Sequence, residues 1–185
     1  MKNVKEIVLK KEAVTRLLDS AIDLYFEGKD LLVVTLIVKS VYQVISDLMK
    51  KKYGESYYGY ARISLNVRDD YQKQVFDSLR EDVNFLKHAD RKDCGLNSEL
   101  VFNHSSCETF LALAIPEYSD LFGDTTDNQK NFLIYYGITN LDAVKEPTKS
   151  QFRTLSLLYP YLLEKKNWMS FPPESFHCFE SPKYW

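Results

Sequence analysis

LLVVTLIVKSVYQVISDLMKKK, residues 31–52, is the stretch that decides the fold class. It contains neither proline nor glycine, and it is far longer than a typical strand although it is rich in β-branched residues. Its first half is apolar nearly all the way round, the pattern of a helix buried on most of its sides. Asp30 stands where an N-cap belongs, lysines 50–52 complement the negative end of the helix dipole, and Gly54 suits a C-cap. The stretch therefore predicts a long, buried central helix.

Helical patterns continue on both sides of this stretch. A helix is predicted from about Val8 to Glu27, and Gly28 then breaks the pattern. Its apolar stripe consists of Val14, Leu17, Leu18, Ala21, Leu24 and Tyr25. A further helix is predicted from residue 69 or 70 to about residue 89. Its core-facing residues are Phe76, Leu79, Val83 and Leu86, which step by 3, 4 and 3.

The second half of the chain predicts three more helical stretches. Ser105 or Ser106 is expected to cap a helix over residues 107–122, which contains a kink at Pro116 and has Glu108 or Glu117 on its polar side. Thr125 or Thr126 is expected to start the next helix, which runs through residues 128–137 and is closed by Gly137. The last stretch covers residues 149–166 and is interrupted at Pro160.

The organisation that follows is an all-α, single-domain helical bundle of about six helices over residues 1–166. Residues 167–185 contain proline, serine and aromatic residues without a period. Because a free tail rarely carries so many aromatic side chains, we expect these residues to pack as an extended C-terminal arm.

Charge and cysteine content limit the classes of function. The net charge of −2 and the pI near 6.0 weigh against tight, non-specific binding of nucleic acid, but they leave room for a local site that engages one or a few phosphates. The longest uncharged apolar run, residues 31–38, is too short to span a bilayer, and the charged start of the chain does not resemble a secretory signal. Three irregularly spaced cysteines are typical of reduced thiols. We expect a cytoplasmic protein without a membrane partner.

One polar flank of the predicted 69–89 helix and the residues just beyond it could carry chemistry. On a helical wheel Arg80, Asn84, Lys87, His88 and Arg91 fall together, beside the core-facing stripe. The three cations could hold a phosphate, and His88 beside Asn84 could move a proton near neutral pH. The alternative is an ordinary solvated helix flank. Both interpretations stay open on the residue pattern alone.

Phe85 is on a different side of the same wheel, away from the core stripe. A Phe exposed there would be costly, so either a second copy of the chain or the C-terminal aromatic arm is expected to cover it.

The spacing of the cysteine and histidine residues gives little support for a metal site. His104 and Cys107 are separated as in some zinc sites, but the chain has no CxxC pair, and the other candidate ligands, Cys94, His177 and Cys178, are scattered. Glycine-rich phosphate loops and a GxSxG elbow are absent from the sequence. We therefore expect no metal and no cofactor.

The stretch NFLKHADR, residues 84–91, resembles the signature helix of the HEPN superfamily of nucleotide-binding helical bundles, which often form dimers. Together with AIDLYFEGKDLLVVTL, residues 21–36, it is similar to a group of uncharacterised bacterial proteins that carry an NFFKHADRD-type motif. The resemblance covers about residues 13–93 and implies an HEPN-like bundle and a homodimer.

In ribonuclease members of that superfamily, an Arg and a polar residue precede a His, and two protomers bring these groups together around RNA without metal. The resemblance implies that Asn84 and His88 match the polar residue and the His, whereas Val83 stands where the Arg is expected. It therefore implies a protein that binds RNA or a nucleotide, with weak or lost ribonuclease activity, in which Arg80, Lys87 and Arg91 contact phosphate. The alternative is a non-catalytic dimeric protein-interaction module in which NFLKHADR is structural.

Overall fold

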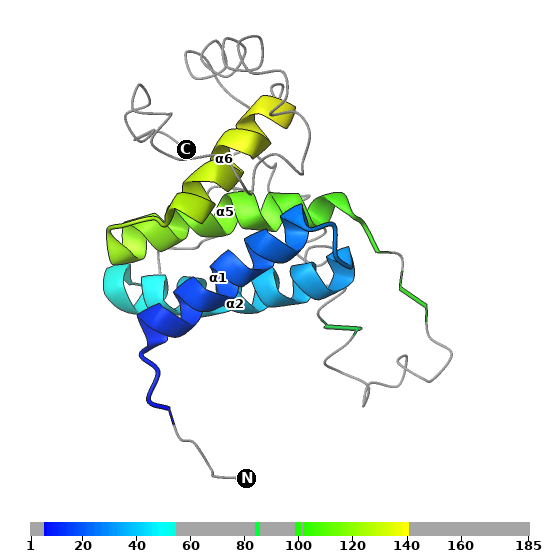
Figure 1. Ribbon diagram of the computed structural model, residues 1–185. Coiled ribbons are helices and arrows are strands. Elements are labelled where there is room, and N and C mark those ends of the chain that lie inside the picture. Colours follow the sequence, from blue (N-terminus) through cyan, green and yellow to red (C-terminus); the bar gives the residue numbers. More distant parts are fainter. Residues whose placement is uncertain (1–5, 55–83, 86–98, 101, 141–185) are drawn as a thin grey trace, which may run out of the picture.

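The computed structural model of the protein describes residues 6–54, 84–85, 99–100 and 102–140. This part of the chain is helical and contains no strand, which confirms the all-α prediction for it. Its helices, labelled as in Figure 1, are α1 (Lys10–Phe26), α2 (Leu31–Tyr53), α5 (Ser105–Phe122) and α6 (Asp127–Thr139). The predicted helix over 149–166, most of the predicted helix over 69–89 and the C-terminal arm lie outside the described residues.

Helix α2 confirms the prediction made from residues 31–52. The Asp30 side chain accepts a hydrogen bond from the backbone N–H of Leu32 at 2.8 Å and caps the first turn. Gly54 follows the last turn with φ +90°, and its N–H donates to the carbonyl of Lys50. Valines 34, 38 and 41, together with Ile45 and Met49, are buried along the helix.

Helices α1 and α2 form an antiparallel hairpin around Gly28, whose φ of +70° favours glycine. The buried residues of α1 are Val14, Leu18, Ala21, Ile22, Tyr25 and Phe26. Leu17, which was predicted to belong to this stripe, is instead 47% exposed. It lies just outside the buried arc because α1 presents only a narrow face to the bundle.

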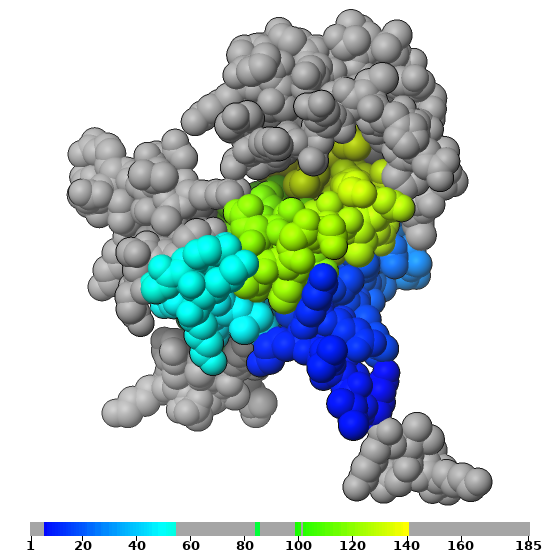
Figure 2. Space-filling view, turned by 90° about the vertical axis from the view of Figure 1, so that its left-hand side faces the viewer, coloured from blue at the N-terminus to red at the C-terminus, as the bar shows by residue number. Residues whose placement is uncertain are grey.

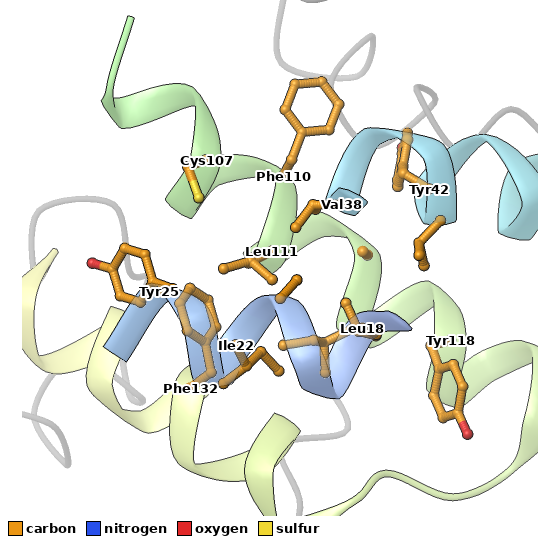
Figure 3. Packing of buried hydrophobic residues seen from close by; sticks show 14 of the residues in the cluster. Leu18, Ile22, Tyr25, Val38, Tyr42, Cys107, Phe110, Leu111, Tyr118 and Phe132 are labelled. Atoms are coloured by element: carbon orange, nitrogen blue, oxygen red, sulfur yellow. The ribbon is translucent and has the colours of Figure 1, made fainter. Parts of the chain in front are cut away.

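Helix α5 lies alongside α1 and α2 and runs in the same direction as α2, while α6 projects from the end of α5 (Figure 1). Buried side chains of all four helices meet in one core, in which Leu18, Ile22, Val38, Leu111 and Phe132 point toward one another (Figure 3). The central position of α5 explains why its sequence is apolar over most of its length.

Three predictions for α5 and α6 are wrong in detail. His104, rather than Ser105 or Ser106, is the N-cap residue of α5, and the preceding Asn103 accepts hydrogen bonds at its Oδ1 from the N–H and hydroxyl of Ser105. Glu117 is buried at 1% exposure instead of lying on the polar side of the helix. Helix α6 continues through Gly137 to Thr139, since buried packing holds this glycine in the helix. The alternative start at Thr126 is confirmed by a capping box with Gln129.

By length and composition alone, α2 is apolar enough to cross a membrane. The bundle buries 44% of its most apolar window, so the helix also fits the core of a soluble protein.

Candidate functional site

The described part of the predicted phosphate site consists of Asn84. Asn84 and the following Phe85 are helical and partly buried. The helical backbone at these two residues agrees with the helix predicted from the apolar stripe. Arg80, Lys87, His88 and Arg91 lie outside the described residues.

A second polar feature, which we call the polar seam, runs along the buried side of α2. It consists of Thr35, Lys39, Tyr42 and Ser46, which are at most 7% exposed. Their spacing of 4, 3 and 4 places them on one face of the helix. Lysine is rarely buried without a partner, so this face must provide for its charge.

Helix α5 provides partners for two residues of the polar seam, Lys39 and Tyr42. The Nζ of Lys39 lies 4.6 Å from the centre of the Phe110 ring, a distance suited to a cation–π contact. The same ring packs edge-on against Tyr42 with 5.6 Å between centroids. The Tyr42 hydroxyl in turn donates to Oε1 of the buried Glu117 at 3.1 Å. Phe110 therefore lies between an ammonium group and a tyrosine that holds a buried carboxylate.

A separate cluster of tyrosines surrounds Glu108 at the start of α5. The hydroxyl of Tyr25 donates to Oε1 of Glu108 and is also within 3.2 Å of the Tyr135 hydroxyl. Burial, together with the hydrogen bond to Glu108, raises the pKa of Tyr25 far above its ordinary value. Burial and the negative charge of Glu108 raise the pKa of Tyr135 and of Tyr136 as well. These hydroxyls consequently stay neutral and act as hydrogen-bond groups rather than as general bases.

Helix α6 is attached to α1 by polar side chains at its first turn. Asp19 of α1 accepts hydrogen bonds from the Thr126 hydroxyl at 2.8 Å and from Nε2 of Gln129 at 2.9 Å. Asp23, one turn later, accepts from Nδ2 of Asn128 at 2.7 Å. Partial burial is the largest influence on Asp19 and, with the nearby charge of Asp23, raises its pKa despite these hydrogen bonds.

This pKa shift gives a pH-dependent prediction for Asp19. A carboxyl whose pKa is higher in the folded state favours folding when it is protonated, so its charge costs stability as the pH rises through the folded pKa. We expect Asp19→Asn, which keeps a carbonyl acceptor, to raise the free energy of unfolding at pH 7 and to have no effect near pH 3. Asp19→Ala removes the acceptor and should lower stability by about 1–2 kcal/mol at pH 7. Urea unfolding at both pH values measures this, and a destabilising Asp19→Asn at pH 7 would contradict it.

The end of the bundle at which α5 stops is rich in lysine. Lys52 Nζ lies 3.4 and 3.2 Å from the carbonyls of Asp120 and Leu121, and Lys11 Nζ lies 3.4 Å from that of Phe122. These cations satisfy carbonyls at the negative end of the α5 dipole, where α5 itself carries no basic residue in its last turn. We call this region the basic end. It comprises Lys10 and Lys11 of α1 and Lys50, Lys51 and Lys52 of α2.

The possible metal ligands do not come together where the structure describes them. Cys107 is completely buried in the core, whereas His104 is exposed and its ring lies against Phe102. Within residues 6–54 and 99–140, as far as they are described, no three His, Cys, Asp or Glu side chains form a group that could hold a metal ion.

The sequence carried a signal for the polar seam that the hydropathy pattern concealed. Residues 31–38 are so apolar that they hide Thr35, yet Thr35 is followed by Lys39, Tyr42 and Ser46 at a regular spacing of 4, 3 and 4. A polar residue repeated at that spacing within a buried helix is a sign of a paired internal face. Comparison of the chain with known protein families, with curated proteins and with solved structures gives no match.

Proposed function

We propose that this chain is a cytoplasmic, HEPN-like helical-bundle protein that binds RNA or a nucleotide as a homodimer. The binding groups are Arg80, Lys87 and Arg91, with Asn84 and His88 beside them. The observation that supports this proposal is the helical, partly buried backbone at Asn84. In the helix that the sequence predicts over residues 69–89, Asn84 and His88 are i,i+4 neighbours, and the site depends on this relation.

We expect measurable binding of RNA but weak or absent RNA cleavage. Three cations on one helix flank can neutralise a phosphate, and the Asn84 amide can donate to it. Cleavage would additionally need a cation held against the scissile phosphate in the transition state, and Val83 stands where the superfamily's ribonucleases have Arg. An enzyme that keeps the His but loses that positioning retains affinity and loses most of its rate.

The test combines RNA binding and RNA cleavage without added metal. Wild type should bind a single-stranded RNA oligonucleotide in fluorescence anisotropy, and Lys87→Gln/Arg91→Gln should bind at least tenfold more weakly. Wild-type cleavage should be weak or at background, and any cleavage should vanish in His88→Ala.

The matched control is Lys29→Gln/Lys130→Gln, which removes the same amount of charge. Lys29 lies between α1 and α2, Lys130 lies in α6, and each is an exposed lysine in a surface ion pair. Equal RNA affinity of the wild type and of Lys87→Gln/Arg91→Gln would contradict the proposed site. Equal, clear cleavage by wild type and His88→Ala would exclude His88 as the proton-transfer group.

A second candidate function is a non-catalytic dimeric protein-interaction module. This alternative rests on the expectation from the sequence that a second copy of the chain covers Phe85, which would be costly if it were exposed. In this case Asn84 and His88 serve local hydrogen bonds. A dimer in sedimentation equilibrium together with no measurable affinity for RNA or mononucleotides would select this function over the first.

A further inference from the structure

Exposed apolar side chains adjoin the basic end. Ile7 is 92% exposed and Leu9 is 70% exposed, immediately before Lys10 and Lys11 in the chain. Leu9 has extended backbone (φ −72°, ψ 151°), so this short segment stands away from the helices. Tyr53, which follows Lys52, is 47% exposed. Large apolar side chains that gather in water at one end of a domain indicate a contact surface.

The basic end and these apolar residues lie on one face of the molecule. Hydrogen bonds from Lys11 and Lys52 to adjacent carbonyls of α5 bring the start of α1 beside the end of α2. Figure 2 shows that face, with the blue start of α1, the cyan end of α2 and the green end of α5 side by side. Tyr53 is fixed there by a 3.3 Å hydrogen bond from its hydroxyl to the carbonyl of Asp120.

The charge on this face is positive but modest. Arg16 is bound to Glu6 at 2.9 Å and to Glu12 at 2.5 Å, so these three side chains together carry one negative charge. Three further carboxylates are exposed on the same parts of the chain: Asp47, Asp120 and Asp124. The five lysines outnumber them by too little to hold a polyanion through charge alone.

We infer that this face binds the surface of an anionic lipid bilayer. The exposed ammonium groups of Lys10 and Lys51 suit an anionic partner, whereas the exposed side chains of Ile7 and Leu9 suit an apolar one. A bilayer that contains anionic lipids supplies both: headgroup phosphates for the ammonium groups and the acyl boundary for the aliphatic side chains. A tyrosine whose ring is apolar and whose hydroxyl is hydrogen-bonded suits the interfacial region between them.

This inference is independent of the proposed RNA site and differs from the expectation of no membrane partner. That expectation followed from the short length of the uncharged run at 31–38, which bears on crossing a bilayer. Surface binding needs only a few apolar side chains together with basic residues. Long lysine side chains can also reach headgroups while their stems cover apolar surface.

Vesicle co-sedimentation of the full chain tests the inference. Wild type should bind vesicles of phosphatidylcholine with about 30% phosphatidylserine and should not bind vesicles of pure phosphatidylcholine. The anionic lipid is needed because each lysine near an anionic surface strengthens binding about fivefold, or by about 1 kcal/mol. Raising the salt concentration to about 0.5 M should release it, since the Debye length then falls to a few ångströms.

Two variants separate the apolar and the charged contributions. Ile7→Ser/Leu9→Ser should weaken binding at least tenfold, and serine at the N-cap position of α1 preserves the helix. Lys10→Gln/Lys51→Gln should weaken binding at least tenfold as well and should also reduce its salt dependence. Neither lysine is one of the two that cap α5.

Matched controls use the same chemistry elsewhere in the fold. Leu17→Ser changes a half-exposed leucine of α1, and Lys29→Gln/Lys130→Gln removes two lysines away from the basic end; both should bind vesicles like wild type. Absence of wild-type binding to anionic vesicles would overturn the inference. Binding that is insensitive to Ile7→Ser/Leu9→Ser, or lysine-dependent binding of an RNA oligonucleotide in its place, would do so too. Loss of RNA binding on Lys87→Gln/Arg91→Gln would leave this inference unaffected.

Discussion

Phe110→Ala is expected to lower the free energy of unfolding by about 3–5 kcal/mol, a large fraction of the roughly 5–15 kcal/mol that is ordinary for a folded domain. Phe110 is buried at 1% exposure and packs edge-on against the Tyr42 ring. Its removal leaves a cavity and also takes away the ring that faces the Lys39 ammonium group at 4.6 Å. Urea unfolding followed by far-UV circular dichroism measures the change.

Phe110→Leu is the matched control, because leucine fills most of the space without offering an aromatic face to Lys39. It should cost about 1–2 kcal/mol. If Phe110→Ala cost less than about 1 kcal/mol, the packing described for α2 and α5 would be wrong. If the alanine and leucine variants were equally unstable, the ring itself, and not the filled volume, would be the main contribution.

Tyr25→Ala is expected to cost a similar amount, about 3–5 kcal/mol. The Tyr25 ring is 1% exposed and makes T-shaped contacts with Phe26, Phe132 and Tyr135, with centroids 5.5–6.0 Å apart. It also joins the end of α1 to α5 through its hydrogen bond to Glu108. Because α6 packs on the same ring, its loss should loosen three helices at once, and calorimetry should show a lower unfolding enthalpy as well as a lower Tm.

Tyr25→Phe separates the hydroxyl from the ring. It should cost about 1–3 kcal/mol at pH 7, the range for leaving a partly buried carboxylate without its donor. The pKa of Tyr25 is raised in the folded state, so the stabilisation from its neutral hydroxyl is present below the unfolded pKa near 10 and is lost as the pH rises above that value. Tyr25→Phe should therefore flatten the loss of stability above about pH 10. An unchanged alkaline slope would contradict this role.

Local patterns predicted the helices well because the local sequence contains the information that positions them. Residues 31–52 carry both a helical hydrophobic run and its capping residues, and Asp30 and Gly54 act as predicted. Thr126 likewise caps α6 through a side chain only three residues away. Capping of this kind depends on neighbours in the chain, so a single sequence reveals it.

Predictions failed where the deciding partner is remote in the chain. Glu117 was one of two carboxylates expected on the polar side of α5, because a carboxylate usually prefers water, but Tyr42, 75 positions earlier, donates a hydrogen bond to it. Gly137 was expected to end α6, but its buried position within the bundle keeps it helical. The exposure of Leu17 likewise depends on which neighbours α1 meets.

The candidate site follows the same rule. The helix at Asn84 could be predicted from the apolar stripe, whereas Phe110 and Glu117, which pair with Lys39 and Tyr42 of the polar seam, lie on a remote helix that the spacing within α2 does not identify. The basic end is also a product of the fold, since it joins lysines from the start of α1 and the end of α2.

The capping of α5 by lysines of other helices has a consequence for folding kinetics. The α1–α2 hairpin is closed by a short turn, so its contacts form at small entropic cost. The carbonyls at the end of α5 are contacted by Lys52, which lies 68 positions before Asp120 in the chain and can reach them only once the two helices have come together. We therefore expect the last turn of α5 to become stable only after the hairpin is in place, so that the hairpin serves as the template for the second half of the bundle.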